Sequence, residues 1–247
     1  MTLLQTEKLH KAYGSLVVTK DVDLEVAAGQ RHIIIGPNGA GKTSLVHQLT
    51  GQIQPTSGRI LFKGRDVTGT VPEALCQMGM GRTFQKNNLF PSLSIRENVR
   101  LAVQAKQGGW YQAFRSIGTR RAQWERADQI LEQVQLSVGH GRPVGSLSYG
   151  EQRQLEVAIA LAAEPELLLL DEPTSGMSPA ETDRMIDLVR GLSASLAVLM
   201  IEHDMKVVFS LADRVTVLYY GEILASGTPA EIQGNERVRE VYLGGKH

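Results

Sequence analysis

Gly36-Pro37-Asn38-Gly39-Ala40-Gly41-Lys42-Thr43 is the stretch of sequence that decides the fold of this 247-residue chain. It matches the pattern G-x-x-x-x-G-K-[ST] in full and lies between a predicted strand, His32–Ile35, and a predicted helix that begins at about Lys42. Glycines let the backbone wrap closely, so that successive N–H groups point at phosphate oxygens, and the helix N-terminus adds a favourable dipole. This context predicts a phosphate-binding loop and disfavours a purely structural Gly-rich turn.

The loop residues predict a site for a nucleotide and Mg²⁺. Lys42 can reach the β- and γ-phosphates, and the Thr43 hydroxyl can ligate the metal. The other residues that we expect around the phosphates are Gly36, Pro37, Asn38, Gly39, Ala40, Gly41 and Ser44.

A pair of acidic residues, Asp171 and Glu172, follows the apolar run Leu167–Leu170. Ligands of open α/β sheets bind at the carboxyl ends of the strands, where this pair would lie. We expect Asp171 to hold Mg²⁺, through water, and Glu172 to polarise the attacking water as a general base. Such a pair can also simply end a strand and cap a helix, but the phosphate loop favours the catalytic interpretation. These parts alone indicate a P-loop nucleotide hydrolase or kinase and do not separate the two.

Short apolar runs alternate with helical patterns, which favours an α/β fold with a parallel sheet covered on both faces. The runs are Ile33–Ile35, Leu167–Leu170, Val198–Ile201 and Val215–Tyr219. Capping-box patterns mark predicted helix starts, with proline at the first helical position in the last two. They are Ser94–Glu97, Ser148–Glu151, Ser178–Glu181 with Pro179, and Thr228–Glu231 with Pro229.

Two further segments shape the predicted architecture. Leu101–Val138 reads as mostly helical, with interruptions at Gly108-Gly109 and Gly118, and we interpret it as part of a helical subdomain inserted into the α/β core. Leu3–Val26, with alternation around Val22–Val26, predicts a strand pair of its own. The predicted organisation is a single domain over 1–247, with a nucleotide-binding core at 1–85 and 165–247 and the helical subdomain at about 90–164.

Composition narrows the class of protein. Lys+Arg and Asp+Glu are equal at 26 each, which argues against a general nucleic-acid binder. The one cysteine, Cys76, leaves neither an intramolecular disulfide nor a Cys-based metal site, and we expect it to be a half-buried apolar residue. There is no signal-peptide pattern at the start and no apolar run near the ~20 residues that span a bilayer. We therefore expect a cytoplasmic protein, whose membrane path, if it serves transport, belongs to other subunits.

Further motifs carry a resemblance to a known family. Leu147-Ser148-Tyr149-Gly150-Glu151-Gln152-Arg153, about twenty residues before Asp171, resembles the signature motif of ABC ATPases. Gln85 resembles their Q-loop glutamine, and His203, in Ile201-Glu-His203-Asp, resembles their switch histidine. Tyr13 sits where the family stacks an aromatic ring on adenine. The resemblance runs in the right order from about Leu3 to Gly227.

This resemblance implies a P-loop NTPase fold of the ABC ATPase type: a mainly parallel sheet flanked by helices, an N-terminal antiparallel β part and an inserted helical subdomain. It implies ATP and Mg²⁺ as ligands and a head-to-tail dimer, in which Ser148 and Gly150 of one subunit face the γ-phosphate held by Lys42 of the other, with Glu151 beside them in the same shared site. His203 and Gln85 would contact the γ-phosphate and the water or metal. Ser148 can also cap its helix with Glu151, and the two roles are compatible.

The chain departs from the family pattern at three positions. Ser178 replaces the usual acidic or amide residue; all three types cap helices, but the lost carboxylate puts the communication between the two sites in doubt. Tyr149 and Glu151 also differ from the commonest signature residues.

Other segments resemble the ATPases of branched-chain amino acid uptake: Gly81–Gln85, Leu89–Pro91, Leu93–Val99, and Val241–Gly244. This resemblance implies an importer of branched-chain or other hydrophobic amino acids. In that group two related ATPases, identical or different, work beneath two transmembrane permease subunits, with a substrate-binding protein acting indirectly. The protein would then lie on the inner face of the plasma membrane through its permeases. Alternatives are an ATPase of another transporter (urea or amide, aromatic acid, or lipid export), an ABC ATPase acting on DNA or the ribosome, and a P-loop kinase.

The segment 104–126 combines aromatic and arginine side chains, and two interpretations remain. It can be a helical hairpin that packs its aromatics, or a docking surface for a membrane subunit's cytoplasmic helix, because aromatics and arginine dominate interface hot spots. The residues concerned are Trp110, Tyr111, Phe114 and Trp124 among Arg115, Arg120, Arg121 and Arg126.

Overall fold

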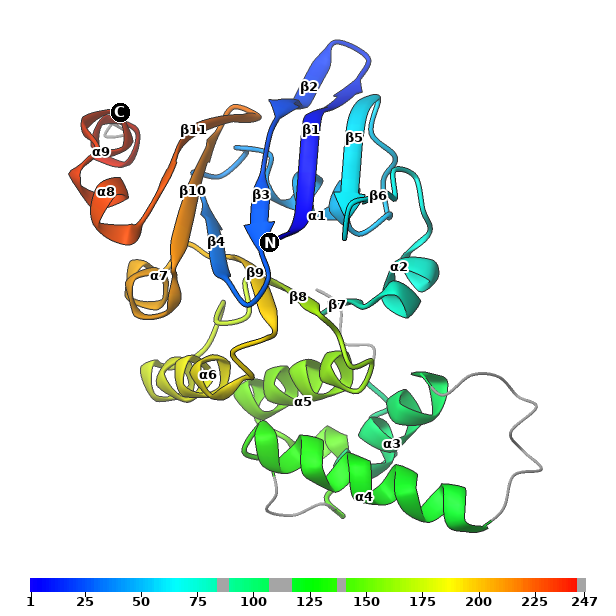
Figure 1. Cartoon of the computed structure of the whole chain (residues 1–247). Coiled ribbons are helices and arrows are strands. Elements are labelled where there is room, and N and C mark those ends of the chain that lie inside the picture. The colour runs from blue at the N-terminus through cyan, green and yellow to red at the C-terminus, as the bar shows by residue number, and fades with distance from the viewer. Residues whose placement is uncertain (84–88, 107–116, 137–140, 244–247) are drawn as a thin grey trace.

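The computed structural model describes residues 1–83, 89–106, 117–136 and 141–243. Within these ranges the larger sheet has six strands in the order β11-β10-β4-β9-β8-β7 (Figure 1). They are β4 Arg31–Ile35, β7 Met80–Arg82, β8 Leu167–Asp171, β9 Ala197–Ile201, β10 Arg214–Tyr219 and β11 Glu222–Gly227. Neighbours run parallel, except that β11 is antiparallel to β10. The predicted mainly parallel sheet is therefore confirmed, and the carboxyl ends of β4, β8 and β9 meet at one edge.

The central strands are continuously apolar because both of their faces are buried. Along β4, Ile33 and Ile35 join one hydrophobic core, whereas Ile34 joins a second core on the opposite face. In β8 the alternation is the same, with Leu168 and Leu170 in the first core and their neighbours in the second. This two-residue period is what a strand between two packed layers requires.

The second core lies between this sheet and an antiparallel sheet, whose order is β2-β1-β5-β6 with β3 also paired to β1. Its strands are β1 Thr2–Tyr13, β2 Leu16–Val22, β3 Glu25–Ala27, β5 Ser57–Phe62 and β6 Arg65–Asp66. The predicted strand pair is present as β1 and β2 and belongs to this larger sheet, and the alternation around Val22–Val26 runs from the end of β2 into β3. The Thr6 hydroxyl donates to Val22 O at 2.7 Å and accepts from Leu24 N at 2.9 Å, so it holds the break where the partner of β1 changes from β2 to β3.

All four predicted capping boxes begin helices. Three have both reciprocal hydrogen bonds at α5, α6 and α8, and at α3 Ser94 N donates to Glu97 Oε2 at 2.7 Å while Glu97 N donates to Ser94 Oγ at 3.2 Å. The helices are α1 Lys42–Leu49, α2 Pro72–Met78, α3 Ile95–Lys106, α4 Ile117–Gln133, α5 Tyr149–Leu161, α6 Pro179–Gly191, α7 Met205–Leu211, α8 Pro229–Gly234 and α9 Glu236–Leu243, with a 3₁₀ turn at Val144–Ser146. None of the helices in the described ranges is both long and apolar enough to cross a bilayer.

Helices α3, α4 and α5 pack together on the side of the larger sheet away from the antiparallel sheet (Figure 1). The predicted interruption at Gly118 is wrong, because this residue lies inside α4. One glycine costs a helix about 1 kcal/mol, and burial of Ala127, Ile130 and Leu131 from the same helix outweighs it. Gly108-Gly109 lie outside the described residues, and the domain boundaries stay a prediction.

In the segment 104–126, the described aromatic residue is Trp124, and it packs within the helical layer. The guanidinium carbons of Arg96 and Arg100 from α3 lie 4.7 and 5.1 Å from its ring centroid. Arg126 pairs with Glu164 at 3.1 Å. These contacts favour the packing interpretation for Trp124; the other aromatics, with Arg115, lie outside the described residues, and the side chain of Arg120 does too.

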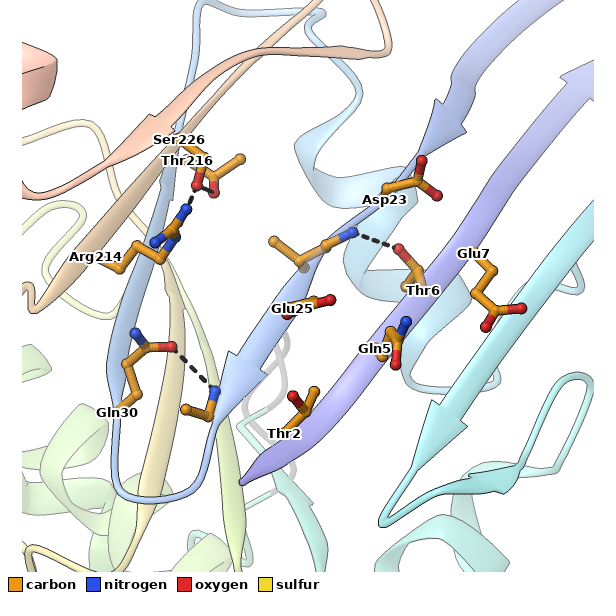
Figure 2. Close-up of a pocket in the computed structure, with 12 residues that line it drawn as sticks. Thr2, Gln5, Thr6, Glu7, Asp23, Glu25, Gln30, Arg214, Thr216 and Ser226 are labelled. Atoms are coloured by element: carbon orange, nitrogen blue, oxygen red, sulfur yellow. Dashed lines mark hydrogen bonds between the residues drawn. The ribbon is translucent and has the colours of Figure 1, made fainter.

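A polar cleft lies where the two sheets approach each other at β1, β3 and β10 (Figure 2). On one wall, Arg214 Nε donates to Ser226 Oγ at 3.0 Å, and that hydroxyl lies 2.9 Å from Thr216 Oγ1. Behind this wall, Nε2 of the buried His32 lies 2.7 Å from the same Thr216 hydroxyl. Burial, with a smaller effect of the Arg214 charge, lowers the pKa of His32 from 6.5 to about 4.

His32 should make the protein less stable in mild acid. The pKa is depressed in the folded state, so the unfolded chain binds more protons between pH 6.5 and 4, and stability falls as the pH falls through this window. Between pH 6.5 and 4 this effect lowers the free energy of unfolding by about 3 kcal/mol. Urea unfolding at several pH values should show a shallower pH dependence for His32→Gln than for the parent, whatever their difference at pH 7.5. Equal slopes would show that another group controls the acid sensitivity.

Candidate nucleotide-binding site

The phosphate loop leaves the carboxyl end of β4 and enters α1. Two of its glycines lie so close to neighbouring backbone atoms that a side chain would not fit. A Cβ on Gly36 would lie 2.2 Å from Leu218 O, and one on Gly41 would lie 2.2 Å from Val18 O. Gly41 is the N-cap of α1 with φ of 100°, and Gly39 has φ of 79°, both in the left-handed region that favours glycine. The loop is therefore pressed between β2 and β10 in a conformation that other residues would strain.

Lys42 holds its ammonium group inside the loop. Its Nζ donates to Gly36 O at 2.8 Å and to Pro37 O at 3.0 Å. Burial lowers the pKa of Lys42, and the negative charges of Glu172 and Asp171 oppose this shift. The ammonium group of Lys42 thus lies between the loop carbonyls and the negative charges of Asp171 and Glu172.

An open cleft of about 640 Å³ lies beside the loop. It is lined by Asn38–Ser44, with Glu172, and by Leu16–Val18 and Tyr220-Gly221. The exposed apolar side chains of Leu16 and Tyr220 were not predicted as site residues. Exposed apolar surface beside a phosphate loop suits the flat face of a nucleotide base.

Asp171 ends β8 and has the environment of a metal ligand. Its side chain is buried, and neither carboxylate oxygen has a hydrogen-bond partner among the described residues. Arg82 Nη2 lies 3.7 Å from Asp171 Oδ2, as an ion pair. Burial raises the pKa of Asp171, and the nearby Arg82 charge opposes this. A buried carboxylate with unused oxygens near Lys42 and the loop fits Mg²⁺, which takes one or two carboxylates together with phosphate oxygens and water.

Glu172 turns sharply out of the sheet into the cleft. Its φ is 47°, in the left-handed region, a strain of about 1–2 kcal/mol for a residue other than glycine. Its N–H donates to Ile201 O at 3.0 Å, which fixes the turn to the end of β9. His203 follows that strand, and its Nδ1 lies 3.8 Å from Glu172 Oε1. The fold therefore brings together two predicted catalytic residues from separate strands.

The signature residues form the start of α5 instead. Ser148 is the N-cap, with its hydroxyl accepting from Glu151 N at 3.2 Å and its N–H donating to Glu151 Oε2 at 2.8 Å. Ser148, Gly150 and Glu151 are not among the residues that line the cleft beside the loop. One chain thus presents a phosphate loop and a signature motif on different parts of its surface.

Comparison with known proteins places the chain among its relatives. The family described as ABC transporter matches residues 19–175, and LivG of Escherichia coli (strain K12), a high-affinity branched-chain amino acid transport ATP-binding protein, is 38% identical over 98% of both chains. The chain belongs to the ABC transporter ATPase family. A second family, described as branched-chain amino acid ATP-binding cassette transporter, matches residues 222–247 of this ABC ATPase.

Solved structures agree with this ABC ATPase in fold. The ATP-binding cassette MJ1267 superposes with a TM-score of 0.87 at 30% identity, covering 98% of this chain and 99% of that one. A dimeric structure of the cassette MJ0796 bound to ADP and Pi has a TM-score of 0.77 at 25% identity, covering 92% of this chain and 99% of that one. The chain is thus a nucleotide-binding, ATP-hydrolysing protein of the ABC class.

The roles of the predicted site residues of this ABC ATPase stay predictions, those of Tyr13 and Gln85 among them. Tyr13, at the end of β1, is half exposed, with Lys11 Nζ 4.8 Å from its ring centroid, and it is not among the residues lining the cleft. It pairs in register with Leu16, which does line it. Gln85 lies outside the described residues.

Glu202 is a site residue that the sequence did not reveal. It is fully buried, and its Oε1 accepts from Thr174 N at 3.2 Å and from Thr174 Oγ1 at 2.7 Å, while Oε2 accepts from His203 N at 3.1 Å. The carboxylate therefore ties the turn after Glu172 to the backbone of His203. The available signal was a charged residue at the end of the apolar run Val198–Ile201.

Ser178, the departure from the family pattern, caps α6 as expected. Its side chain accepts from Glu181 N, and the reciprocal bond completes the capping box. The backbone geometry at this position therefore does not need an acidic or amide side chain.

Proposed function

We propose that this ABC ATPase powers the uptake of branched-chain amino acids, hydrolysing ATP at sites shared between two ATPase subunits. The observation that carries the proposal is that Lys42 and Glu172 line one cleft at the carboxyl edge of the sheet, while the charge of the adjacent Asp171 also acts on Lys42. The match of residues 222–247 to the branched-chain cassette family supports the cargo class.

In this proposal each residue acts on a stated atom. The loop N–H groups and Lys42 bind the β- and γ-phosphates. Glu172 accepts a proton from a water molecule as the oxygen of that water attacks the γ-phosphorus. The bond between the γ-phosphorus and the β–γ bridging oxygen breaks, and ADP and phosphate are released. His203, held by Glu202, contacts the γ-phosphate. Gln85 is proposed to contact the γ-phosphate and the attacking water or the metal.

Asp171, Thr43 and Gln85 are the residues proposed to hold Mg²⁺, whose charge stabilises negative charge on the phosphate oxygens. Asp171 is suited to this by its buried, unpartnered oxygens. Thr43 is exposed in the lining of the cleft and can offer its hydroxyl.

The proposed second subunit supplies Ser148, Gly150 and Glu151 to the far side of the nucleotide. The dimeric MJ0796 cassette bound to ADP and Pi supports pairing in this class. Each chain carries one loop and one signature motif, so two chains complete two sites. The partner is a second copy or a related ATPase.

The proposed membrane partners are two permease subunits, which hold the ATPase at the cytoplasmic face of the plasma membrane, with a substrate-binding protein acting through them. Nucleic acid is not a proposed partner. The residues of the core, 1–85 and 165–247, would bind the nucleotide, and those at about 90–164 would carry the signature motif.

Uptake in cells tests this function. Deleting the gene should abolish uptake of radiolabelled leucine, and the parent chain should restore it while Glu172→Gln should not. Loss of urea uptake with normal leucine uptake would contradict the cargo and leave the ATPase assignment intact. Transfer of phosphate to a small molecule instead of water would contradict hydrolysis itself.

A further inference from the structure

One carboxylate, that of Glu181 in α6, bridges the starts of two helices. Its Oε2 accepts from Ser178 N at 3.0 Å and Ser178 Oγ at 2.8 Å, within its own capping box. Its Oε1 accepts from Ser148 Oγ and from Gly150 N, each at 3.2 Å, at the start of α5. The side chain therefore reaches across 33 residues of sequence to the signature motif.

Gly150 is shaped to receive this side chain. A Cβ at that position would lie 2.6 Å from Glu181 Oε1 and 2.8 Å from both Cγ and Cδ. Such distances are too short for any side chain to coexist with the present position of Glu181. The lack of a side chain at position 150 therefore leaves room for Glu181 in the single chain.

The two contacts use the same donors that the proposed function assigns to ATP. A serine hydroxyl and a backbone N–H at the N-terminus of a 13-residue helix are suitable donors for an anion. The Gly150 N–H has one hydrogen, so it cannot serve the Glu181 carboxylate and a phosphate oxygen fully at once. Two anions at hydrogen-bond distance also repel each other.

We propose that Glu181 is an autoinhibitory residue that occupies the signature-motif donors in the unpaired chain, and that the γ-phosphate of the partner subunit's ATP must displace it. This inference rests on the proposed function, because it needs Ser148 and Gly150 to bind phosphate across the dimer. Displacement frees one oxygen, while the other can keep its bonds to Ser178 and so preserve the cap of α6. Glu181 thereby sets how much ATP is needed to pair two subunits.

The chain contains a matched control for Glu181. Thr228-Pro229-Ala230-Glu231 has the same Pro-Ala-Glu capping box as Ser178–Glu181, and Glu231 closes it in the same way. Both carboxylates can be changed to the neutral, isosteric glutamine, which retains an acceptor for the cap. Only the Glu181 change removes a negative charge from Ser148 and Gly150.

Pairing is measured by sedimentation of the full chain with ATP and Mg²⁺, in a Glu172→Gln background that retains ATP. We expect Glu181→Gln to lower the dimer dissociation constant about tenfold, because the charged hydrogen bonds to Ser148 and Gly150 and the repulsion between the Glu181 carboxylate and the γ-phosphate are both removed. We expect Glu231→Gln to change this constant less than twofold. Unchanged or weaker pairing with Glu181→Gln overturns the proposal. If the Glu172→Gln chain stays monomeric with ATP, the shared site between two copies fails instead.

The contact itself is measured without any pairing. In the nucleotide-free full chain, we expect Glu181→Ala to shift the Gly150 amide resonance and to raise its hydrogen-exchange rate, while Glu231→Ala leaves both as in the parent. A Gly150 amide unaffected by Glu181→Ala overturns the proposal, whether or not the subunits pair.

Discussion

ATP hydrolysis should fall by about 10²–10⁴-fold in Glu172→Gln, because a general base contributes about that much to a proton-transfer step. Glu172 lines the cleft beside the loop, and its backbone is held in a left-handed turn that aims the side chain there. Glutamine has the same shape and cannot take the proton from the attacking water. Phosphate release under saturating ATP and Mg²⁺ measures the effect, and ATP binding should stay within a few-fold of the parent.

The control is Glu166→Gln, at the opposite end of the same strand. Glu166 is exposed and pairs with Lys63, so its charge is removed far from the cleft, and turnover should be unchanged. Ordinary turnover in Glu172→Gln would remove Glu172 from the catalytic role. Equal losses in both variants would indicate damage to β8 rather than to the chemistry.

Nucleotide affinity should fall by about 10- to 100-fold in Lys42→Ala. Charge-assisted hydrogen bonds contribute about 1.5–3 kcal/mol, and each 1.4 kcal/mol is tenfold in affinity. The ammonium of Lys42 lies against the carbonyls of Gly36 and Pro37, inside the curve where phosphates are expected. Equilibrium titration with a fluorescent ATP analogue measures the change.

Lys63→Ala is the matched lysine deletion for this prediction. Lys63 donates to Met78 O and to the Glu166 carboxylate, away from the loop, and its removal should leave affinity as in the parent. Binding by Lys42→Ala at parental affinity would refute the phosphate assignment. A loss of folding, seen by circular dichroism, would make Lys42→Met the variant to compare, since it retains the packing of the aliphatic stem.

Several features were predictable because they depend on residues close together in the sequence. The phosphate loop needs only its own glycines, Lys42 and the flanking strand and helix, and the structure has them in that order. Each capping box joins residues three apart, so its hydrogen bonds form whenever the helix does. The acidic pair Asp171-Glu172 is placed by the strand that precedes it.

Some local patterns were overridden by packing. The glycine at position 118 suggests a helix break, but it is the second residue of α4, and buried residues further along stabilise this helix. For the glycine, the burial of other residues of α4 outweighs a local cost of about 1 kcal/mol. The alternation around Val22–Val26 is typical of a strand, and the structure divides it between β2 and β3, where Thr6 of β1 bonds to Val22 and Leu24.

The sequence by itself determined the family, the loop, the strand ends and the helix starts, because each is written in a short run of residues with its own hydrogen bonds. Only the tertiary structure decided that Arg82 lies beside Asp171, that Glu202 holds Thr174, and that Glu181 reaches Gly150. These pairs stand 28 or more residues apart. Their distances follow from how the sheet and helices pack around two shared cores, and no single stretch of sequence contains that geometry.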